Sequence, residues 1–329
     1  MQNGLFVFVS PGWGLRIYFY GICIEEKMTD DMTTPATTHS VETRKKDWKR
    51  LCDTHGKTMV SSHNREGMLI IEHYQPHFWN VESPTGESIA KNWLNPDLRQ
   101  KAEDRTKLHY TKVYKSEIRR NLAFFSKAPL PTVYRPLLVK GIVEHTGAKQ
   151  ILDPTIGWGG RLIGTLAVDG TTFTGCDPCL ATFKGLENIT DFIGGGNRAT
   201  LYQQDCLTVL PTLTTGFYDL VLTSPPYFDL EVYSKESSQS VQQFTTWNEW
   251  VKGFLKPMII ECLRCLKPTG VSAWSVKNIK KCKLQDEVFR IHKDAGWTLS
   301  ETMGMTATPR NTGGKAKITE ETFLFRKVA

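Results

Sequence analysis

The residues with the clearest chemical character are Ser224-Pro225-Pro226-Tyr227, which follow the apolar run Tyr218–Leu222. That run is typical of a buried parallel strand, and two prolines end it because they cannot donate to the ladder. A stiff loop is therefore expected at the carboxyl end of the strand, where open α/β sheets bind their ligands. There a serine hydroxyl and a proline carbonyl offer two hydrogen-bond acceptors beside the flat face of a tyrosine. The set suits a planar group that carries an NH2, and a plain proline-rich turn is the alternative.

A glycine-rich turn lies earlier in the chain. Residues 150–164 read as a strand, the acid Asp153, the glycines Gly157, Gly159 and Gly160, and the start of a helix. Glycines let the backbone approach a ligand closely, and the turn leads into a helix N-terminus, where N–H groups are free to bind one. The spacing lacks the full Gly-x-Gly-x-x-Gly pattern of a dinucleotide site. The turn is therefore expected either to bind another ligand or to be an ordinary strand-to-helix connection.

Acidic residues stand at the ends of three successive predicted strands. Asp153 ends the first, Asp177 follows Thr172–Cys176, and Asp205 follows Leu201–Gln204. Singly, each acid fits a helix cap as well as it fits a ligand. A carboxylate at the second strand end can accept both hydroxyls of a ribose, as in other nucleoside-binding α/β folds. Their order ahead of the proline motif favours one binding site.

The elements that must position these residues alternate between strand and helix patterns from about residue 128 onward. This alternation predicts a doubly wound, mostly parallel sheet that closes with an antiparallel pair. Helices are expected over 137–143, 247–266 (capped by Thr246 or Asn248) and 284–295, and later strands over 271–276, 297–303 and 322–327. Three regions are expected, namely an N-terminal extension with a flexible linker (1–45), a basic region (46–127) and the main domain (128–329).

The part of the chain before the main domain gives weaker patterns. Residues 1–27 read as two strands around a turn, and Met68–Ile71 reads as a short strand. Residues 97–127 are helical in pattern and basic. They and the charge run Arg44–Arg50, where Trp48 is available to stack, suit either phosphate contact or a solvated helix face.

The motifs of the main domain resemble those of the S-adenosylmethionine-dependent amino-methyltransferases, which methylate exocyclic nitrogens of cytosine or adenine. The segment Asp153-Pro154-x-x-Gly157-x-Gly159-Gly160 is similar to their cofactor loop, and Ser224–Tyr227 is similar to their catalytic signature. The spacing is similar to that of enzymes encoded by phages and large viruses. The resemblance covers about residues 125–329. It implies a Rossmann-like class I methyltransferase fold, with seven strands in the order 3-2-1-4-5-7-6. The residues before it lie outside the resemblance and are expected to form an N-terminal α+β extension.

The resemblance also implies roles for single residues, with S-adenosylmethionine as the cofactor. Asp153 would lie near its methionine moiety, Asp177 would bind the ribose, and Asp205 would face the adenine amino group. Further cofactor contacts are implied for Tyr134, Arg135, Pro154, Gly157, Gly159, Gly160 and Cys206. The catalytic residues would be Ser224, Pro225, Pro226 and Tyr227. Substrate contacts are expected from Phe228, Tyr233, Arg310, Lys315 and Lys317.

The expected reaction is direct in-line attack of the target amine on the cofactor's methyl group, after the base has flipped out of its duplex. Serine at the first motif position (Ser224) is commoner in cytosine-N4 enzymes than in adenine enzymes, so cytosine N4 in DNA is the expected target. The alternatives are adenine N6 in DNA, an amino group of RNA (guanine N2 or adenine N6), a protein glutamine, and a binding module without catalysis.

The charge, the cysteine content and the apolar runs of the chain indicate its partners and its compartment. The net charge of +7 and the pI of about 8.9 suit a polyanion such as DNA or RNA. Eight cysteines without an evident signal peptide indicate a reducing, intracellular compartment rather than secretion, in a prokaryotic or infected host cell or in a nucleus. The pairs Cys176/Cys179 and Cys262/Cys265 are too far apart to favour zinc, so no metal is expected. No apolar run is long enough to predict a membrane helix.

Overall fold

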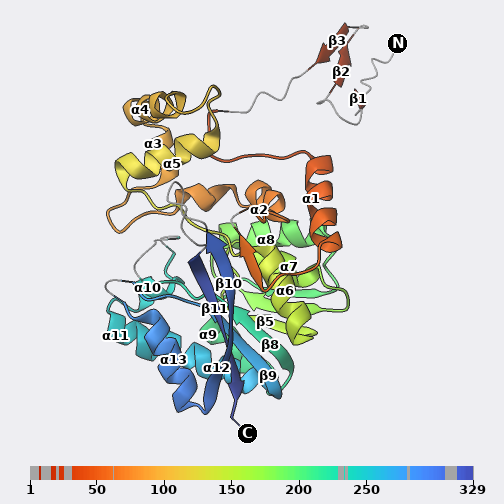
Figure 1. The fold of residues 1–329 in the computed structure, drawn as a ribbon, viewed down its shortest axis with the longest axis vertical. Helices are drawn as coiled ribbons and strands as arrows, with labels where there is room; N and C mark the ends of the chain where they lie inside the picture. The colour runs from red at the N-terminus through yellow and green to blue at the C-terminus, as the bar shows by residue number, and fades with distance from the viewer. Residues whose placement is uncertain are drawn as a thin grey trace.

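An eight-stranded sheet crosses the middle of the molecule, and helices cover both of its faces (Figure 1). The structure is a computed structural model. It describes in full residues 32–61, 63–228, 233, 236–279, 282–306 and 320–328, and the backbone alone of 7–8, 16–19, 22–25, 307 and 317–319.

The strand order of the sheet is β4-β10-β11-β9-β8-β5-β6-β7. Counted along the chain from β5, seven of these strands follow the expected order 3-2-1-4-5-7-6, which is that of the Rossmann-like class I methyltransferase fold. Only β11 runs against the other strands of this sheet, because it pairs antiparallel with both β9 and β10. The seven strands are β5 (Gln150–Asp153), β6 (Thr172–Cys176), β7 (Ala199–Tyr202), β8 (Tyr218–Thr223), β9 (Leu266–Ser275), β10 (Trp297–Ala307) and β11 (Lys317–Lys327).

The eighth strand, β4 (Met59–Ser61), was not expected, and it pairs parallel with the outer edge of β10. The strand expected at Met68–Ile71 is wrong, since these residues begin helix α2 (Met68–Tyr74). A short apolar run fits a buried helix as well as a buried strand. Here the Asp47 carboxylate accepts a hydrogen bond from the Leu69 N–H (2.9 Å), which satisfies a free donor of the first helical turn.

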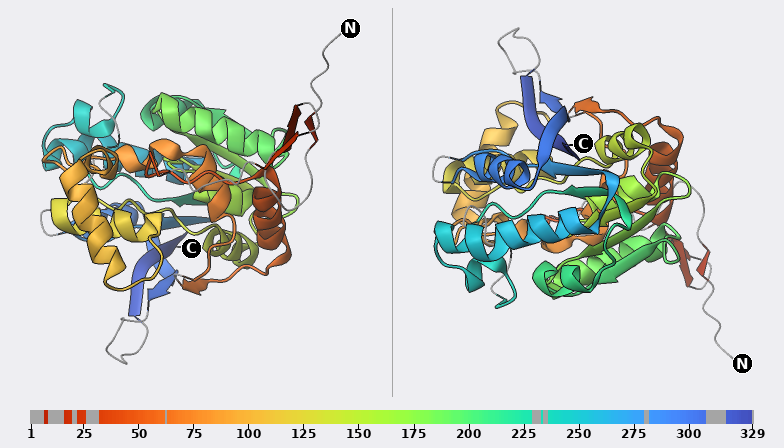
Figure 2. Two further views of the ribbon diagram at one scale, coloured as in Figure 1. Left: turned by 90° about the horizontal axis from the view of Figure 1, so that it is seen from above. Right: turned by 90° about the horizontal axis from the view of Figure 1, so that it is seen from below.

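Side chains of the sheet alternate between two cores. In β8, Leu220 and Leu222 belong to one core and Val221 belongs to the other. This period of two is what a strand buried on both faces requires. Figure 2 shows the two helix layers from above and below. One layer holds α6 (Pro136–Thr146), α7 (Gly160–Leu166) and α8 (Leu180–Phe192), and the other holds α9 (Cys206–Val209), α12 (Lys256–Cys265) and α13 (Leu284–Asp294).

The helix expected over 247–266 is confirmed in three consecutive pieces. Thr246 is its cap, because its hydroxyl accepts from the Glu249 N–H while the Glu249 carboxylate accepts from the Thr246 N–H. The pieces are α11 (Trp247–Trp250), a π-helical turn (Val251–Leu255) and α12. The remaining short helices of this half are a 3₁₀ turn (Leu210–Thr212) and α10 (Ser240–Gln243).

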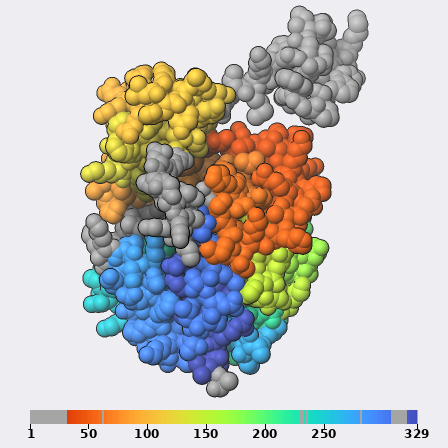
Figure 3. All heavy atoms as spheres, in the orientation of Figure 1, coloured from red at the N-terminus to blue at the C-terminus, as the bar shows by residue number. Residues whose placement is uncertain are grey.

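Residues before position 128 form two structural groups. Helix α1 (Val41–Asp53), β4 and α2 pack into the same core as α6, through Leu51, Val60 and Ile70. Four further helices form a cluster with its own small core; the last three stand above the sheet in Figure 1, and the last two are yellow at the top of Figure 3. They are the 3₁₀ helix η1 (Pro76–Asn80), α3 (Ile89–Trp93), α4 (Pro96–Lys107) and α5 (Lys115–Ser126).

Several basic residues expected on a phosphate-binding face have internal partners instead. Arg119 donates to the Pro35 carbonyl oxygen (2.6 Å), and Lys115 donates to that of Ala36 (2.6 Å). These bonds hold residues 32–37, expected within a flexible linker, against the helical cluster. In the charge run at 44–50, the buried Arg44 lies over the rings of Tyr74 and Phe192, so this part of the run is not a free cationic face.

The N-terminal strands β1 (Val7–Phe8), β2 (Arg16–Phe19) and β3 (Ile22–Glu25) pair antiparallel, one strand more than the two expected. Among the helices that the structure describes, none combines the length and the apolar character needed to cross a membrane.

Candidate active site

A cavity of about 470 Å³ opens at the carboxyl ends of the parallel strands. That size is typical of a small-molecule site. Residues that follow β5, β6, β7, β8 and β9 all contribute to its wall. The residues singled out from the sequence that line it are Tyr134, Pro154, Gly157, Gly160, Asp177, Asp205, Cys206, Ser224, Pro225, Pro226, Tyr227 and Tyr233.

The two segments with the strongest motifs meet in this cavity through Thr155. Its hydroxyl lies 2.7 Å from Thr223 Oγ1 and 3.1 Å from the carbonyl oxygen of Ser224. Thr223 donates its own hydrogen to Asp153 (2.8 Å), so the single Thr155 hydrogen is shared between Thr223 Oγ1 and the Ser224 carbonyl. The glycine bend and the proline turn are therefore joined at one rim of the sheet.

Asp153 does not reach the cavity, which corrects its expected place beside the cofactor. Its side chain is fully buried, and its carboxylate accepts from Arg161 Nε (2.7 Å) and from the Thr155 N–H (3.2 Å). Arg161 also donates to the carbonyl oxygens of Thr155 and Ile156. The buried ion pair of Asp153 and Arg161 therefore stabilises the backbone of the glycine bend. No role was expected for Arg161 or Thr155, although the acid before the glycines and the base after them indicate such an ion pair.

The glycines allow two close approaches of backbone. Gly157 and Gly159 have φ of 59° and 93°, in the region that favours glycine. A Cβ on Gly160 would lie 2.1 Å from the carbonyl oxygen of Tyr134, so this residue brings the 130–134 segment against the bend. The Tyr134 hydroxyl hydrogen-bonds Thr322, and burial raises the pKa of this tyrosine. Gly159 and Arg135, both expected to contact the cofactor, do not line the cavity.

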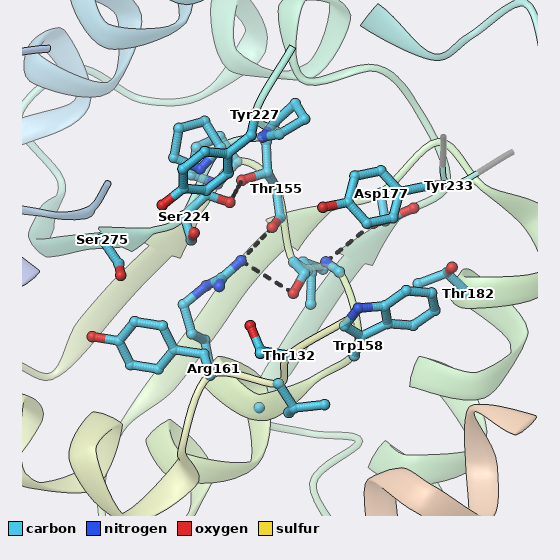
Figure 4. A pocket seen from close by; sticks show the side chains of 18 of the residues that line it. Thr132, Thr155, Trp158, Arg161, Asp177, Thr182, Ser224, Tyr227, Tyr233 and Ser275 are labelled. Carbon is cyan, nitrogen blue, oxygen red and sulfur yellow. Dashed lines mark hydrogen bonds between the residues drawn. The ribbon is translucent and has the colours of Figure 1, made fainter. Parts of the chain in front are cut away.

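Asp177 joins the second strand end to the glycine bend. Its carboxylate accepts from the Gly157 N–H (3.1 Å) and the Cys179 N–H (2.9 Å), and it faces the cavity across from Ser224 (Figure 4). Burial raises the pKa of Asp177 to about 6, and the two N–H donors act against that rise. The carboxylate keeps lone pairs that a ligand hydroxyl can approach from the cavity.

Asp205 serves as a helix cap and lines the cavity as well. One carboxylate oxygen accepts from the Leu207 N–H (2.9 Å) at the start of α9, and the other accepts from Gln243 Nε2 (2.9 Å). Its neighbour Cys206 also lines the cavity. Burial raises the pKa of the Cys206 thiol well above its usual range, which makes it a poor nucleophile and suits a contact role.

The proline turn presents two unused acceptors to the cavity. Within the described part of the chain, neither Ser224 Oγ nor the Pro225 carbonyl oxygen takes part in a hydrogen bond. Figure 4 shows Ser224 and Tyr227 on one side of the cavity, with Asp177, Tyr233 and Trp158 on the other. A ligand that filled the space between these two sides would touch both motifs.

Phe228 does not line the cavity, which corrects its expected contact with substrate. Its ring is 8% exposed and packs on Trp247 (5.8 Å between ring centroids) and Trp250 (5.9 Å). Its φ of 52° is rare for a bulky residue and costs on the order of 1–3 kcal/mol. The buried ring therefore anchors the turn and holds it in a strained shape, while Tyr227 faces the cavity.

Aromatic rings form the opposite wall. Trp158, between two of the glycines, lies 6.1 Å from the Tyr233 ring and packs on Phe78 (5.0 Å) and His77 (5.3 Å) of η1. No role was expected for Trp158 from its place in the sequence. The described residues contain no group of three or more His, Cys, Asp or Glu side chains placed to hold a metal ion.

The basic loop expected to grip the substrate is only partly described. Arg310 and Lys315 lie outside the described residues, and Lys317 begins β11 with its side chain also outside them. Their substrate contacts stay predictions.

Replacing Asp153 by alanine should lower the free energy of unfolding by about 3–5 kcal/mol, because it leaves the buried Arg161 guanidinium without its counter-charge. Urea unfolding measures the loss. Asp53→Ala is the control, since it removes an exposed carboxylate from a surface pair on α1 and should barely move the unfolding midpoint. Equal midpoints for the two variants would show that the Asp153 pair does not brace the fold.

Comparison with known proteins gives matches in solved structures only. No protein-family model matches the sequence, and no curated protein matches it. The chain is similar to TrmN from Thermus thermophilus, at 17% identity and a TM-score of 0.41, over 63% of this chain and 53% of that one. It is also similar to NSun6 from Pyrococcus horikoshii with SFG, at 16% identity and a TM-score of 0.44, over 63% of this chain and 55% of that one.

A third similar structure is a SAM-dependent O-methyltransferase from Thermotoga maritima, at 14% identity and a TM-score of 0.42, over 63% of this chain and 70% of that one. This chain thus spans about half the length of the TrmN and NSun6 chains that it matches.

Proposed function

We propose that this chain is an S-adenosylmethionine-dependent methyltransferase whose target is the exocyclic amino group of a DNA base, cytosine N4. One observation carries the proposal: the unused acceptors of the proline turn and the glycine bend face the same cavity and are joined through Thr155. Transfer of a methyl group requires near contact of the reacting atoms, and two motifs at one cavity would bring cofactor and amine that close.

The residues around the glycine bend fit the cofactor. Asp177 turns a carboxylate to the cavity, where it would accept the ribose hydroxyls. Asp205 and Cys206 would lie at the adenine, and Gly157 would allow the backbone close to the ligand. When bound, the cofactor supplies an activated methyl group, and the protein supplies binding and orientation.

The residues of the proline turn fit an amine. Its two N–H groups would donate to Ser224 Oγ and to the Pro225 carbonyl, which draws the nitrogen from planar toward tetrahedral and frees its lone pair. Tyr227 would stack on the base and fix its plane. The turn cannot relax away from the amine, because the buried Phe228 ring anchors it next to these acceptors. Positioning and exclusion of water then provide the rate gain.

Two observations support the choice of substrate. The serine at position 224 favours cytosine over adenine by resemblance, and the net charge of +7 suits a nucleic acid. A base in duplex DNA would have to leave its stack to reach the cavity, at a cost of a few kcal/mol.

Nucleoside mass spectrometry of cells that express the chain tests this function. DNA hydrolysed to nucleosides should contain N4-methylcytosine, and cells that express Ser224→Ala should show at least about a hundredfold less, since the amine loses one of its two fixed contacts. Ser300→Ala is the matched control, because it removes a hydroxyl that donates to Leu324 outside the cavity.

The same hydrolysates decide among the alternatives. N6-methyladenine without N4-methylcytosine in DNA would overturn the choice of base, and a methylated nucleoside found only in RNA would overturn the choice of nucleic acid. Full product from the Ser224→Ala cells would remove the assigned role of the hydroxyl.

Cofactor affinity should fall as the pH drops through about 6, where burial places the pKa of Asp177. The ionised carboxylate accepts hydroxyl groups and the protonated one accepts fewer, so binding should weaken by up to about tenfold per pH unit below that value. Isothermal titration calorimetry at a series of pH values measures the effect. Asp177→Asn should bind more weakly at neutral pH and lack the step. An unchanged step in that variant would assign the titration to another group, such as Glu320, which also lines the cavity and whose pKa partial burial raises.

A further inference from the structure

A second surface with binding character lies on the helical cluster, on the hairpin of α4 and α5. Phe124 is 63% exposed, and Tyr110 and Tyr114 of the turn between the helices are 41% and 46% exposed. Single exposed apolar residues are ordinary, but several aromatic rings on one small cluster are not. We define the α4–α5 surface by Lys101, Arg105, Tyr110, Lys112, Tyr114, Phe124 and Phe125.

Cations of the α4–α5 surface lie over its rings. The Arg105 guanidinium carbon is 4.2 Å from the ring centroid of Phe124, Lys101 Nζ is 4.5 Å from that of Phe125, and Lys112 Nζ is 5.6 Å from that of Tyr114. None of these three cations forms an ion pair with a residue that the structure describes. Their charge is therefore open to a partner, in contrast to that of Lys115 and Arg119.

The excess positive charge of the chain is concentrated here. Residues 94–127 hold nine Lys and Arg against four Asp and Glu, a net of +5 out of the chain's +7. Three of the four acids already pair within the cluster, namely Glu103, Asp104 and Glu117. A region with this excess of positive charge attracts a polyanion.

A short stretch of chain connects the surface to the wall of the cavity. Helix α5 ends at Ser126, and the chain continues to Leu130, which is 43% exposed and lines the cavity. The six residue steps from Phe124 to Leu130 span at most about 22 Å. In Figure 1 the cluster stands on the side toward which the β10 arrow points, the side of the cavity.

We infer that the α4–α5 surface binds an unpaired segment of nucleic acid, next to the nucleotide whose base enters the cavity. Bases would stack on Phe124 and Tyr114, and phosphates would contact Lys101, Arg105 and Lys112. Every base has a flat face, so stacking tolerates sequence, but a base inside a duplex has no free face to offer. The statement that the bound segment lies next to a target nucleotide rests on the proposed function. Binding to the surface can be measured without methyl transfer.

Fluorescence anisotropy with the full chain tests the inference, using labelled single-stranded DNA, single-stranded RNA of the same sequence, and the DNA duplex. Single strands should bind more tightly than the duplex. Phe124→Ala should weaken single-strand binding by about tenfold, the usual effect of removing one stacking ring. Arg105→Gln should reduce the slope of log affinity against log salt by about 0.7, the value for one phosphate contact on a single strand. The DNA and RNA arms show which of the two the surface prefers.

Two variants serve as matched controls. Phe217 is 47% exposed but precedes β8, at the sheet edge opposite the cavity, and Arg290 is an exposed cation on α13 that pairs with Glu287 and Asp294. Phe217→Ala and Arg290→Gln should leave single-strand binding unchanged. Thermal unfolding of all four variants verifies that each is folded.

Equal affinity for duplex and single strands, together with no effect of Phe124→Ala, would overturn the inference, because contacts to phosphates alone would then explain binding. Equal losses in the test and control variants would overturn it too. If N4-methylcytosine is made while Phe124→Ala binds normally, the inference fails and the proposed function stands. If Phe124→Ala weakens single-strand binding but no methylated nucleoside is found in the cells, the inference stands and the proposed function fails.

Discussion

The site depends on the hydrogen bond that the Thr155 hydroxyl shares between Thr223 Oγ1 and the carbonyl oxygen of Ser224. It joins the loop after β5 to the loop after β8, two strands that pair side by side at the centre of the sheet. By bonding the carbonyl of Ser224, it fixes that peptide and leaves Ser224 Oγ open to the cavity. The buried pair of Asp153 and Arg161 supports this contact from below. A buried, hydrogen-bonded network of this kind gives one arrangement rather than several.

Much of the site could be predicted from the sequence, because strand ends and turn residues have local signatures. The glycines, Asp177, Asp205 and the proline turn all come to one cavity, since carboxyl ends of parallel strands share an edge. The direction in which a side chain points at a strand end could not be predicted. Asp153 points beneath the bend, and Phe228 points into the core because its φ is positive, while Tyr227 beside it faces the cavity.

The region before residue 128 shows the limit of counting charges. Lys115 and Arg119 looked as suited to phosphate as Lys101 and Arg105, yet the first two hold the 32–37 segment and the last two lie over exposed rings. Only tertiary structure separates a cation that hydrogen-bonds another segment of the chain from one that lies over an aromatic ring at the surface. The same holds for the strand expected at 68–71, where a short apolar run was compatible with either element and packing decided for a helix.

Steady-state kinetics of Thr155→Val tests the joined-loop account most directly. Valine keeps the shape of the side chain and removes the hydroxyl, so turnover should fall by about tenfold or more while cofactor affinity stays within about twofold, and Thr155→Ser should restore turnover. Turnover of the valine variant equal to that of the unmodified chain would contradict the claim that this bond sets the proline turn beside the cofactor.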